Sequence, residues 1–367
     1  MRIAINGWFY GHLTTGSGQY LKALAEWLPS VASGNEFIMI KRCDEVEQGG
    51  KGVLHTEQGS GGKAQYLQTE HAPGTTQDAI RTIHASTPFD RVNANLAKLW
   101  FEQVTFPRAC HRLRADVAFV PYWGSPWWRP CPVVVTVHDL IPLLLPIYRG
   151  GMLQRAYTAL VSRTARRAAV VLTDSEASKR DIIARLGIPD ARVHAIYLAA
   201  DPCFLPVTDP DELARVRVKY GLPEAPFLLY LGGFDVRKNV GRMIEAYAQM
   251  RSGDRGQETG VRSQPVLSPG PCSPALRTFG AIPDICPLPD LVIAGKLPAT
   301  DTAFSPDPRP LAARLGVGEC VHFIGWVDEE DKPALYSLAL GTVFASEYEG
   351  FGLPVLEAMA CEKVRSA

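Results

Sequence analysis

A short segment near the end of the 367-residue chain restricts the fold more than any other. Residues 341–361 read GTVFASEYEGFGLPVLEAMAC, in which a short apolar run precedes a glycine-containing loop and an apolar helical segment. Gly350 and Gly352 allow the backbone to turn tightly and to approach a ligand closely. Pro354 suits the first position of a helix, where a backbone N–H is not needed. The pattern predicts a buried strand, a glycine loop and a helix that starts at this loop.

A glycine loop that leads into a helix N-terminus is an anion-binding arrangement, because unpaired backbone N–H groups point outwards there. Two carboxylates flank the loop, Glu349 before it and Glu357 in the expected first turn of the helix. Carboxylate oxygens only accept hydrogen bonds, so each group can hold a pair of neighbouring sugar hydroxyls. An acidic residue in a first turn also has a structural explanation, since it matches the helix dipole. Taken alone, Glu357 is better explained in that way.

A second glycine loop follows the apolar run 226–231 and reads GGFDVRKN over residues 232–239. Arg237 and Lys238 precede a helical pattern, and cations are unfavourable at a helix N-terminus because the dipole is already positive there. A bound diphosphate would stabilise these two cations. The alternative is a local ion pair with Asp235 or Glu245.

The first half of the chain contains two further candidate regions. Gly16 and Gly18 lie between the apolar run 2–6 and a helical pattern, but the third glycine of a dinucleotide-binding fingerprint is absent. From the residues alone, an ordinary turn explains these two glycines slightly better than an anion site. His138 directly follows the apolar run 132–137. Ligands of open parallel sheets bind beyond the carboxyl ends of the strands, so this position favours a functional histidine over a structural one.

Residues 349–360, EGFGLPVLEAMA, resemble the Glu-x7-Glu signature of the family 4 glycosyltransferases. The Gly-x-x-x-x-Arg-Lys-Asn run that ends at residue 239 resembles the donor-pyrophosphate element of the same family, and the His-Asp pair at 138–139 also matches. The resemblance implies the α/β GT-B fold, in which two doubly wound Rossmann-like domains face a cleft. It also implies sugar transfer with retention of anomeric configuration, without a metal ion or another cofactor.

The resemblance assigns roles to single residues. Arg237 and Lys238 would stabilise the diphosphate leaving group, Glu357 would bind the ribose hydroxyls, and Glu349 would hold the donor sugar. His138 would contact that sugar from the other domain. The donor-binding set implied in this way is Gly16, Gly18, Gly233, Arg237, Lys238, Glu349, Gly350, Phe351, Gly352, Leu353 and Glu357.

The sequence divides into an acceptor-side domain over residues 1–200, a linker over 201–224 and a donor-binding domain over 225–367. Residues 252–289 are rich in Gly, Pro, Ser and Arg and are expected to be a disordered insertion. Relatives continue beyond the helix at 354–360, so the second domain is expected to be truncated. A catalytically impaired fragment that at most binds nucleotide is therefore one alternative, and a GT-B sugar-nucleotide epimerase is another.

Composition limits the partners. The chain carries 38 basic and 38 acidic residues, and this balance does not indicate nucleic acid. The eight cysteines contain no C-x-x-C pair, so a metal cluster is not expected and a reducing cytoplasm fits. The N-terminus lacks the apolar core of a signal peptide. Arginines on the predicted helix 153–168 favour a solvated basic face, with attraction to anionic lipid as the alternative.

The expected function is transfer of a sugar, with a mannose-type hexose as the working guess, from a nucleotide-diphosphate sugar to a hydroxyl of a glycan or lipid-linked acceptor. The expected location is the cytoplasm, with peripheral contact at the inner face of the membrane left open.

Overall fold

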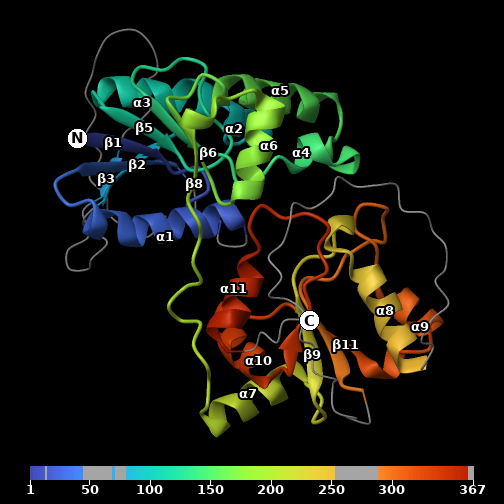
Figure 1. The fold of residues 1–367 in the computed structure, drawn as a ribbon. Helices are drawn as coiled ribbons and strands as arrows, with labels where there is room; N and C mark the ends of the chain where they lie inside the picture. Colours follow the sequence, from blue (N-terminus) through green and yellow to red (C-terminus); the bar gives the residue numbers. More distant parts are fainter. Residues whose placement is uncertain (13–14, 44–67, 71–79, 253–287, 363–367) are drawn as a thin grey trace. The chain divides into compact units, whose positions relative to one another are not determined.

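The computed structural model describes residues 1–12, 15–43, 68–70, 80–252 and 288–362. The chain separates into two compact units, Met1–Tyr197 and Leu198–Ala367, and each is considered by itself (Figure 1). Residues 253–287 of the expected insertion and most of the Gly-rich stretch 44–76 lie outside the described residues.

The first unit is built on a sheet with the strand order β3-β4-β2-β1-β5-β6-β7-β8. All neighbouring strands are parallel except β3 and β4, which are antiparallel. The strands are β1 (Arg2–Asn6), β2 (Glu36–Arg42), β3 (Gln68–Glu70), β4 (Ile80–Ala85), β5 (Val117–Val120), β6 (Val133–Thr136), β7 (Val170–Thr173) and β8 (Val193–Ala195). The helices are α1 (Gly16–Val31), α2 (Ala94–Trp100), α3 (Phe106–Arg112), α4 (Ile141–Leu144), α5 (Met152–Ala165) and α6 (Glu176–Leu186).

Both faces of this sheet are buried, as expected for parallel strands. Successive side chains of a strand point to opposite faces. In β1, Ala4 therefore joins the core that includes Phe106 of α3, whereas Ile5 joins the core that includes Leu21 of α1. Helix α1 covers one face, and α2, α3 and α5 lie on the other (Figure 1).

Residues 94–112 form one continuous helical segment. Helix α2 runs into a π-helical turn, Phe101–Thr105, which continues into α3. Pro107 lies in the first turn of α3, where its missing N–H is tolerated. The π turn also directs Glu102 into the protein interior.

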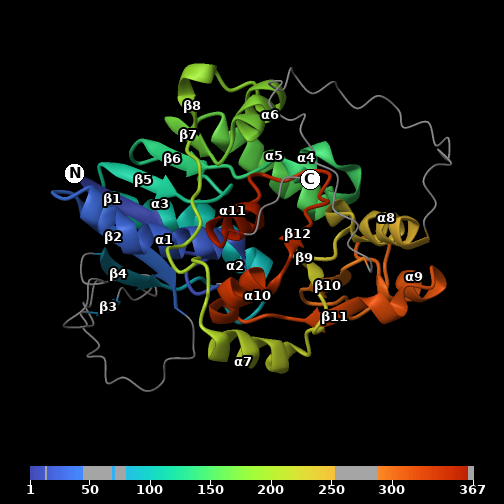
Figure 2. The same ribbon diagram turned by 60° about the horizontal axis from the view of Figure 1, so that its bottom comes forward.

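The second unit contains a parallel sheet with the order β11-β10-β9-β12. Its strands are β9 (Phe227–Leu231), β10 (Asp290–Ala294), β11 (Val321–Gly325) and β12 (Gly341–Thr342), and its helices are α7 (Pro210–Tyr220), α8 (Val240–Ser252), α9 (Arg309–Arg314), α10 (Lys332–Leu338) and α11 (Leu353–Ala360). Leu229 faces a core shared with α7, α10 and α11, and Tyr230 faces a core shared with α8 and α9 (Figure 2).

Residues 201–224 were interpreted as a linker, but they contain helix α7, which packs into the second unit through buried Val216. The helix is fixed by Asp331, whose side chain is fully buried in the turn before α10. Asp331 accepts hydrogen bonds from Lys219 Nζ at 2.5 Å and Tyr220 Oη at 2.6 Å, and it also pairs with Arg215. Although burial alone would raise the pKa of Asp331, these donors lower it to about 2.

We predict that Asp331→Asn destabilises the second unit by about 2 kcal/mol at neutral pH. The native pKa lies below the unfolded value, so the stabilisation is present at neutral pH and is lost as the pH falls from about 4 to about 2. Hydrogen exchange of α7 and α10 during urea unfolding measures the effect.

Asp328→Asn is the matched control, because Asp328 also contacts Lys219, at 2.8 Å, but is exposed. Equal stability of the Asp331→Asn variant and the wild type would contradict the role of Asp331.

Candidate functional site

Two glycine loops meet at the carboxyl edge of the second sheet. One follows β9 and forms a 3-10 turn, Val236–Lys238, before α8. The other follows β12 and ends at Gly352, which precedes α11. Strands β9 and β12 are parallel neighbours, so residues about 110 positions apart in the chain come together here.

Glu349 joins the two loops. Its carboxylate pairs with both Arg237 and Lys238, and all three side chains are mostly buried. Arg237 also donates from Nη1 to the carbonyl of Tyr348 at 2.8 Å, and its Nε lies 3.4 Å from Asp235 Oδ1. The sequence suggested either a local pair or an anion site, and the structure shows Asp235 and the more distant Glu349 as partners of these cations.

Charge compensation determines the state of Glu349. Burial alone would raise the pKa of Glu349, but Lys238 and Arg237 hold it below its ordinary value. The group therefore stays a carboxylate at neutral pH. The arrangement presents two cations and an ionised carboxylate at the edge where ligands of parallel sheets bind.

Gly352 sets the direction of α11. Its φ of +100° lies in a region that residues with a side chain rarely adopt. The helix begins at Leu353, one residue before the expected start, and no side chain caps its first N–H groups. The uncapped N–H groups at the N-terminal end of α11 can therefore bind an anion. Gly350, Phe351 and Leu353 lie in or next to this turn.

Glu357 lies beyond the first turn of α11, because the helix begins at Leu353 and has no acidic residue in that turn. The dipole-matching explanation for this acid is therefore wrong. Instead, Glu357 Oε2 accepts a hydrogen bond from Tyr336 Oη at 2.8 Å. Burial raises the pKa of Glu357 in spite of this bond.

The loops that follow β9 and β10 approach each other closely. The carbonyl of Gly233 accepts a hydrogen bond from Tyr230 Oη at 2.6 Å. A Cβ on Gly295 would lie 2.0 Å from the carbonyl oxygen of Gly232, so the backbones of these two loops approach closely. Gly233 itself lies in the loop that carries Arg237 and Lys238.

In the first unit, Gly16 and Gly18 lie at the start of α1, which Thr15 caps. Thr15 Oγ1 accepts a hydrogen bond from the Gly18 amide at 3.1 Å. A Cβ on Gly18 would lie 2.1 Å from the carbonyl oxygen of His12, so the turn itself requires this glycine. The amide of Gly18 is used within the helix cap.

His138 lies just beyond β6, at the carboxyl edge of the first sheet. Its Nδ1 is 2.7 Å from Asp174 Oδ2, its Nε2 is 3.3 Å from the carbonyl of Pro121, and Tyr20 packs edge-on with ring centroids 5.0 Å apart. Sequence reasoning missed Asp174 as part of this site. The signal was available, because Asp174 directly follows the buried strand β7, the parallel neighbour of β6.

A buried polar network near the same edge was also missed. Glu102 accepts hydrogen bonds from Tyr157 Oη at 3.0 and 3.1 Å and lies 3.2 Å from Lys98 Nζ. Burial raises the pKa of Glu102 despite these partners. Tyr122 Oη donates to Oδ1 of Asn6, the last residue of β1, at 3.1 Å. The network ties α5 to the loop that follows β5.

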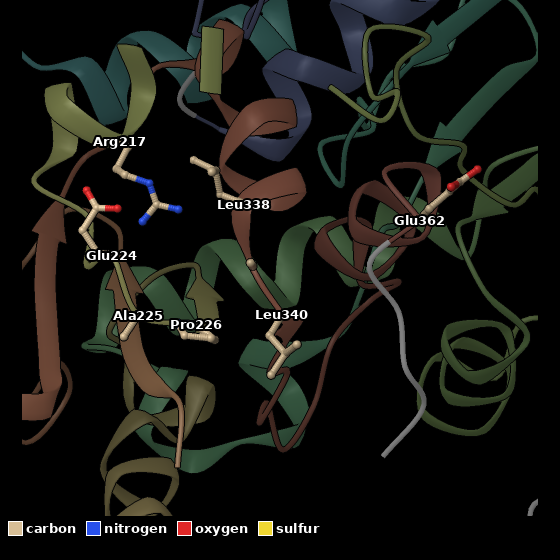
Figure 3. Close-up of a pocket in the computed structure, with 8 residues that line it drawn as sticks. Arg217, Glu224, Ala225, Pro226, Leu338, Leu340 and Glu362 are labelled. Carbon is tan, nitrogen blue, oxygen red and sulfur yellow. The ribbon is translucent and has the colours of Figure 1, made fainter. Parts of the chain in front are cut away.

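A pocket of the second unit lies at the opposite, amino end of β9 (Figure 3). It is lined by Arg217, Glu224, Ala225, Pro226, Leu338, Ala339, Leu340 and Glu362. The charged cluster around Glu349 follows the carboxyl ends of β9 and β12, so this pocket is separate from it.

The two-unit architecture matches known structures. Sucrose-phosphate synthase from Thermosynechococcus elongatus superimposes with a TM-score of 0.60 at 21% identity, covering 98% of this chain and 79% of that one. HepE from Anabaena, solved with UDP and glucose, gives a TM-score of 0.59 at 16% identity, covering 99% and 79%. Both units therefore have the Rossmann-like α/β architecture of the GT-B fold.

Sequence comparison identifies the family. The model for Glycosyltransferase Family 4 matches residues 58–203, and the model for Glycosyl transferases group 1 matches residues 282–365. The chain belongs to the family 4 glycosyltransferases of the GT-B class, as the two motifs of the second unit predicted.

Two curated relatives illustrate the range of activities in this group. O-antigen chain mannosyltransferase B of Escherichia coli is 30% identical over 228 residues, which is 62% of this chain and 50% of the relative. Alpha-D-kanosaminyltransferase of Streptomyces kanamyceticus is 26% identical over 236 residues, 61% of this chain and 51% of the relative. The chain thus spans about half the length of these relatives.

None of the helices in the described ranges is long and apolar enough to cross a bilayer.

We predict that Glu349→Gln destabilises the second unit by about 2 kcal/mol at neutral pH, because two mostly buried cations lose their charged partner. Since the native pKa of Glu349 is lowered, its stabilisation is present above the ordinary value of 4.5 and is lost as the pH falls below it. Urea unfolding at several pH values measures this.

Glu347→Gln is the control, since Glu347 is exposed and lies 3.4 Å from Arg242. A stability difference between wild type and Glu349→Gln that persists unchanged to low pH would refute the electrostatic explanation.

Proposed function

We propose that this protein transfers a hexose, with mannose as the working choice, from a nucleotide-diphosphate sugar to a hydroxyl group of a glycan or lipid-linked acceptor, with retention. The observation that carries the proposal is the cluster of Arg237, Lys238 and Glu349 next to the uncapped start of α11. The choice of mannose is supported by relatives that are named as mannosyltransferases. The choice of a nucleotide donor is supported by structural neighbours that were solved with UDP.

In this proposal the diphosphate of the donor binds Arg237 and Lys238 and the N–H groups at the start of α11. Cations that face developing negative charge in a partly buried site stabilise a leaving group. The bond between the anomeric carbon and the diphosphate oxygen breaks, the carbon bonds to the acceptor oxygen, and the proton of the acceptor hydroxyl passes to the departing diphosphate. The nucleoside diphosphate leaves with the electron pair of the broken bond.

Glu349 has two successive partners in this proposal. Without a ligand it neutralises Arg237 and Lys238. An incoming diphosphate competes for the same cations, and this exchange would release carboxylate oxygens to accept hydrogen bonds from hydroxyls of the donor sugar. A nucleoside diphosphate without the donor sugar would break the Glu349 pairs but offer Glu349 no donor-sugar hydroxyls in return. The exchange would therefore favour the complete donor over its product.

Glu357 and His138 complete the proposed set. Glu357, on α11, is proposed to bind the ribose hydroxyls through one carboxylate oxygen. The other oxygen, Oε2, accepts the hydrogen bond from Tyr336, which orients the carboxylate. His138 is proposed to contact the transferred sugar. Asp174 fixes the ring of His138 through Nδ1, so we assign it as a positioning residue.

Two alternatives make different predictions. An epimerase would release a free altered sugar or nucleotide sugar, whereas a transferase forms a glycoside that mass spectrometry detects. A catalytically impaired chain would bind nucleotide without forming either product. We further propose that the protein works in the cytoplasm, where nucleotide sugars are the donors it would meet.

We predict that Arg237→Ala and Lys238→Ala each weaken nucleoside-diphosphate binding by about 1.5–3 kcal/mol, because each removes a charge-assisted contact. Calorimetric titration with UDP, GDP and ADP and with their hexose conjugates measures the affinities and identifies the base. Glu349→Gln is expected to bind the free diphosphate at least as well as wild type but to lose the preference for the sugar conjugate.

Arg242→Ala is the control for these titrations, because Arg242 is exposed on α8 and pairs with exposed Glu347. Unchanged affinity in both cation variants would remove the phosphate role from Arg237 and Lys238.

We predict that His138→Ala and Asp174→Asn lower the rate of transfer without changing nucleotide affinity. Asp174→Asn keeps the shape of the side chain but removes the charge that holds the histidine Nδ1–H. The transfer rate is measured at saturating donor over a range of pH, since a positioning residue changes the pH profile. A loss of nucleotide affinity in Asp174→Asn equal to its loss of rate would contradict this assignment.

A further inference from the structure

Two cysteines of the first unit come together although they belong to different elements. Cys110 lies in α3, and Cys131 lies just before β6 (Figure 1). The sequence contains no C-x-x-C pair, so it did not indicate that any two of its cysteines act together. The pair is therefore created by the fold, which brings the end of α3 to the start of β6.

The backbone near both cysteines is fixed where the chain enters β5. The amide of Ala115 donates to the carbonyl of Cys110 at 3.0 Å. The amide of Ala118 donates to the carbonyl of Pro132, the residue after Cys131, at 2.9 Å. Because Ala115 and Ala118 are close neighbours in the chain, these two bonds hold the end of α3 beside the residues that precede β6.

The two side chains are also in contact. Cys110 is 1% exposed, and Cys131 is partly exposed and packs against the same apolar core. Both are free thiols, and they form a hydrogen bond with each other. A disulfide forms without backbone movement only between cysteines whose Cα atoms lie within about 7 Å of each other. Hydrogen-bonded thiols on two segments that are held side by side suit this requirement.

The two thiols differ in reactivity. The hydrogen bond with Cys110 holds the pKa of Cys131 below its ordinary value, although burial and the nearby Asp116 act in the opposite direction. The same hydrogen bond and deeper burial raise the pKa of Cys110. Since the thiolate is the nucleophilic form of cysteine, the partly exposed Cys131 reacts first and the buried Cys110 stays protonated.

We propose that Cys110 and Cys131 are a peroxide-sensitive pair that forms a reversible disulfide. The Cys131 thiolate attacks one oxygen of hydrogen peroxide, the O–O bond breaks, and the departing hydroxide takes up a proton to form water. The resulting Cys131 sulfenic acid is then attacked by the Cys110 thiol, whose proton passes to the departing hydroxyl group. A second water leaves as the S–S bond forms, so the two thiols lose the two electrons that the peroxide gains.

The disulfide ties the end of α3 to the start of β6 and closes a loop that contains β5. Such a link stabilises a folded unit mainly because it constrains the unfolded chain. In a reducing cytoplasm both thiols stay reduced, and a thiol reductant restores them after oxidation. This inference rests on the two cysteines alone and is independent of the proposed sugar transfer.

Peptide mapping of the full chain after treatment with hydrogen peroxide tests the proposal. Trypsin releases the two cysteines in residues 109–112 and residues 115–149, because it does not cleave between Arg129 and Pro130. Mass spectrometry is expected to find these peptides joined after oxidation and separate after dithiothreitol. The urea midpoint of the first unit is expected to rise by about 1 M on oxidation.

Dimedone, which labels sulfenic acids, distinguishes the roles of the two thiols. In Cys110→Ala the sulfenic acid has no partner thiol, so Cys131 is expected to carry the label, whereas the wild type loses it by forming the disulfide. In Cys131→Ser the buried core is unchanged, and Cys110 is expected to remain unlabelled. Neither variant should show the rise in urea midpoint on oxidation.

Cys203→Ala is the matched control. Although Cys203 is exposed, partial burial of its thiol and the carboxylate of Asp201 raise its pKa to about 11. This variant should form the link and gain stability as the wild type does. Absence of the linked peptides in the oxidised wild type would overturn the proposal, as would a disulfide between two chains in its place. Labelling of Cys110 in Cys131→Ser, without labelling of Cys131 in Cys110→Ala, would also overturn it.

Discussion

The parallel arrangement of the strands is the constraint on which both candidate regions depend. In a parallel sheet every strand ends at the same edge, so residues that follow different strands meet there. Beyond β6 and β7 this brings His138 to Asp174, which lie 36 positions apart in the chain. Beyond β9 and β12 it brings Lys238 to Glu349, which lie 111 positions apart. Neither contact follows from local sequence, but both follow from strand order.

The Glu349 pairs show how the second unit maintains a charged site without a ligand. Two cations before α8 and beside the uncapped start of α11 would repel each other and the positive ends of both helices. One ionised carboxylate, together with Asp235 near Arg237, offsets this charge. The unit therefore folds with its cations already in position. A ligand that displaces Glu349 must interact with Arg237 and Lys238 more favourably than the carboxylate does. In the proposed function, that competition would favour a ligand with both phosphates and sugar hydroxyls.

The sequence predicted the fold because its buried strands are short apolar runs bounded by glycine and polar residues. It predicted less well where packing competes with local pattern. Helix α7 has a weak apolar signal, Val216 alone being fully buried, and depends on the buried Asp331 contacts, which are distant in sequence. The π turn at Glu102 and the position of Glu357 beyond the first turn depend on single-residue shifts in helix boundaries that periodicity does not resolve.

The average composition does not show how the charged residues are distributed along the chain. The equal numbers of acidic and basic residues did not indicate nucleic acid as a partner, but acids and bases are distributed unevenly along the chain. In the second unit, carboxylates such as Glu349 and Asp331 neutralise nearby cations and thereby hold loops and helices together. Along α4 and α5 there are no carboxylates at all. Compensated charges therefore have a structural role in the second unit. The net charge of a chain does not reveal this role, because it sums over all residues and not over their contacts.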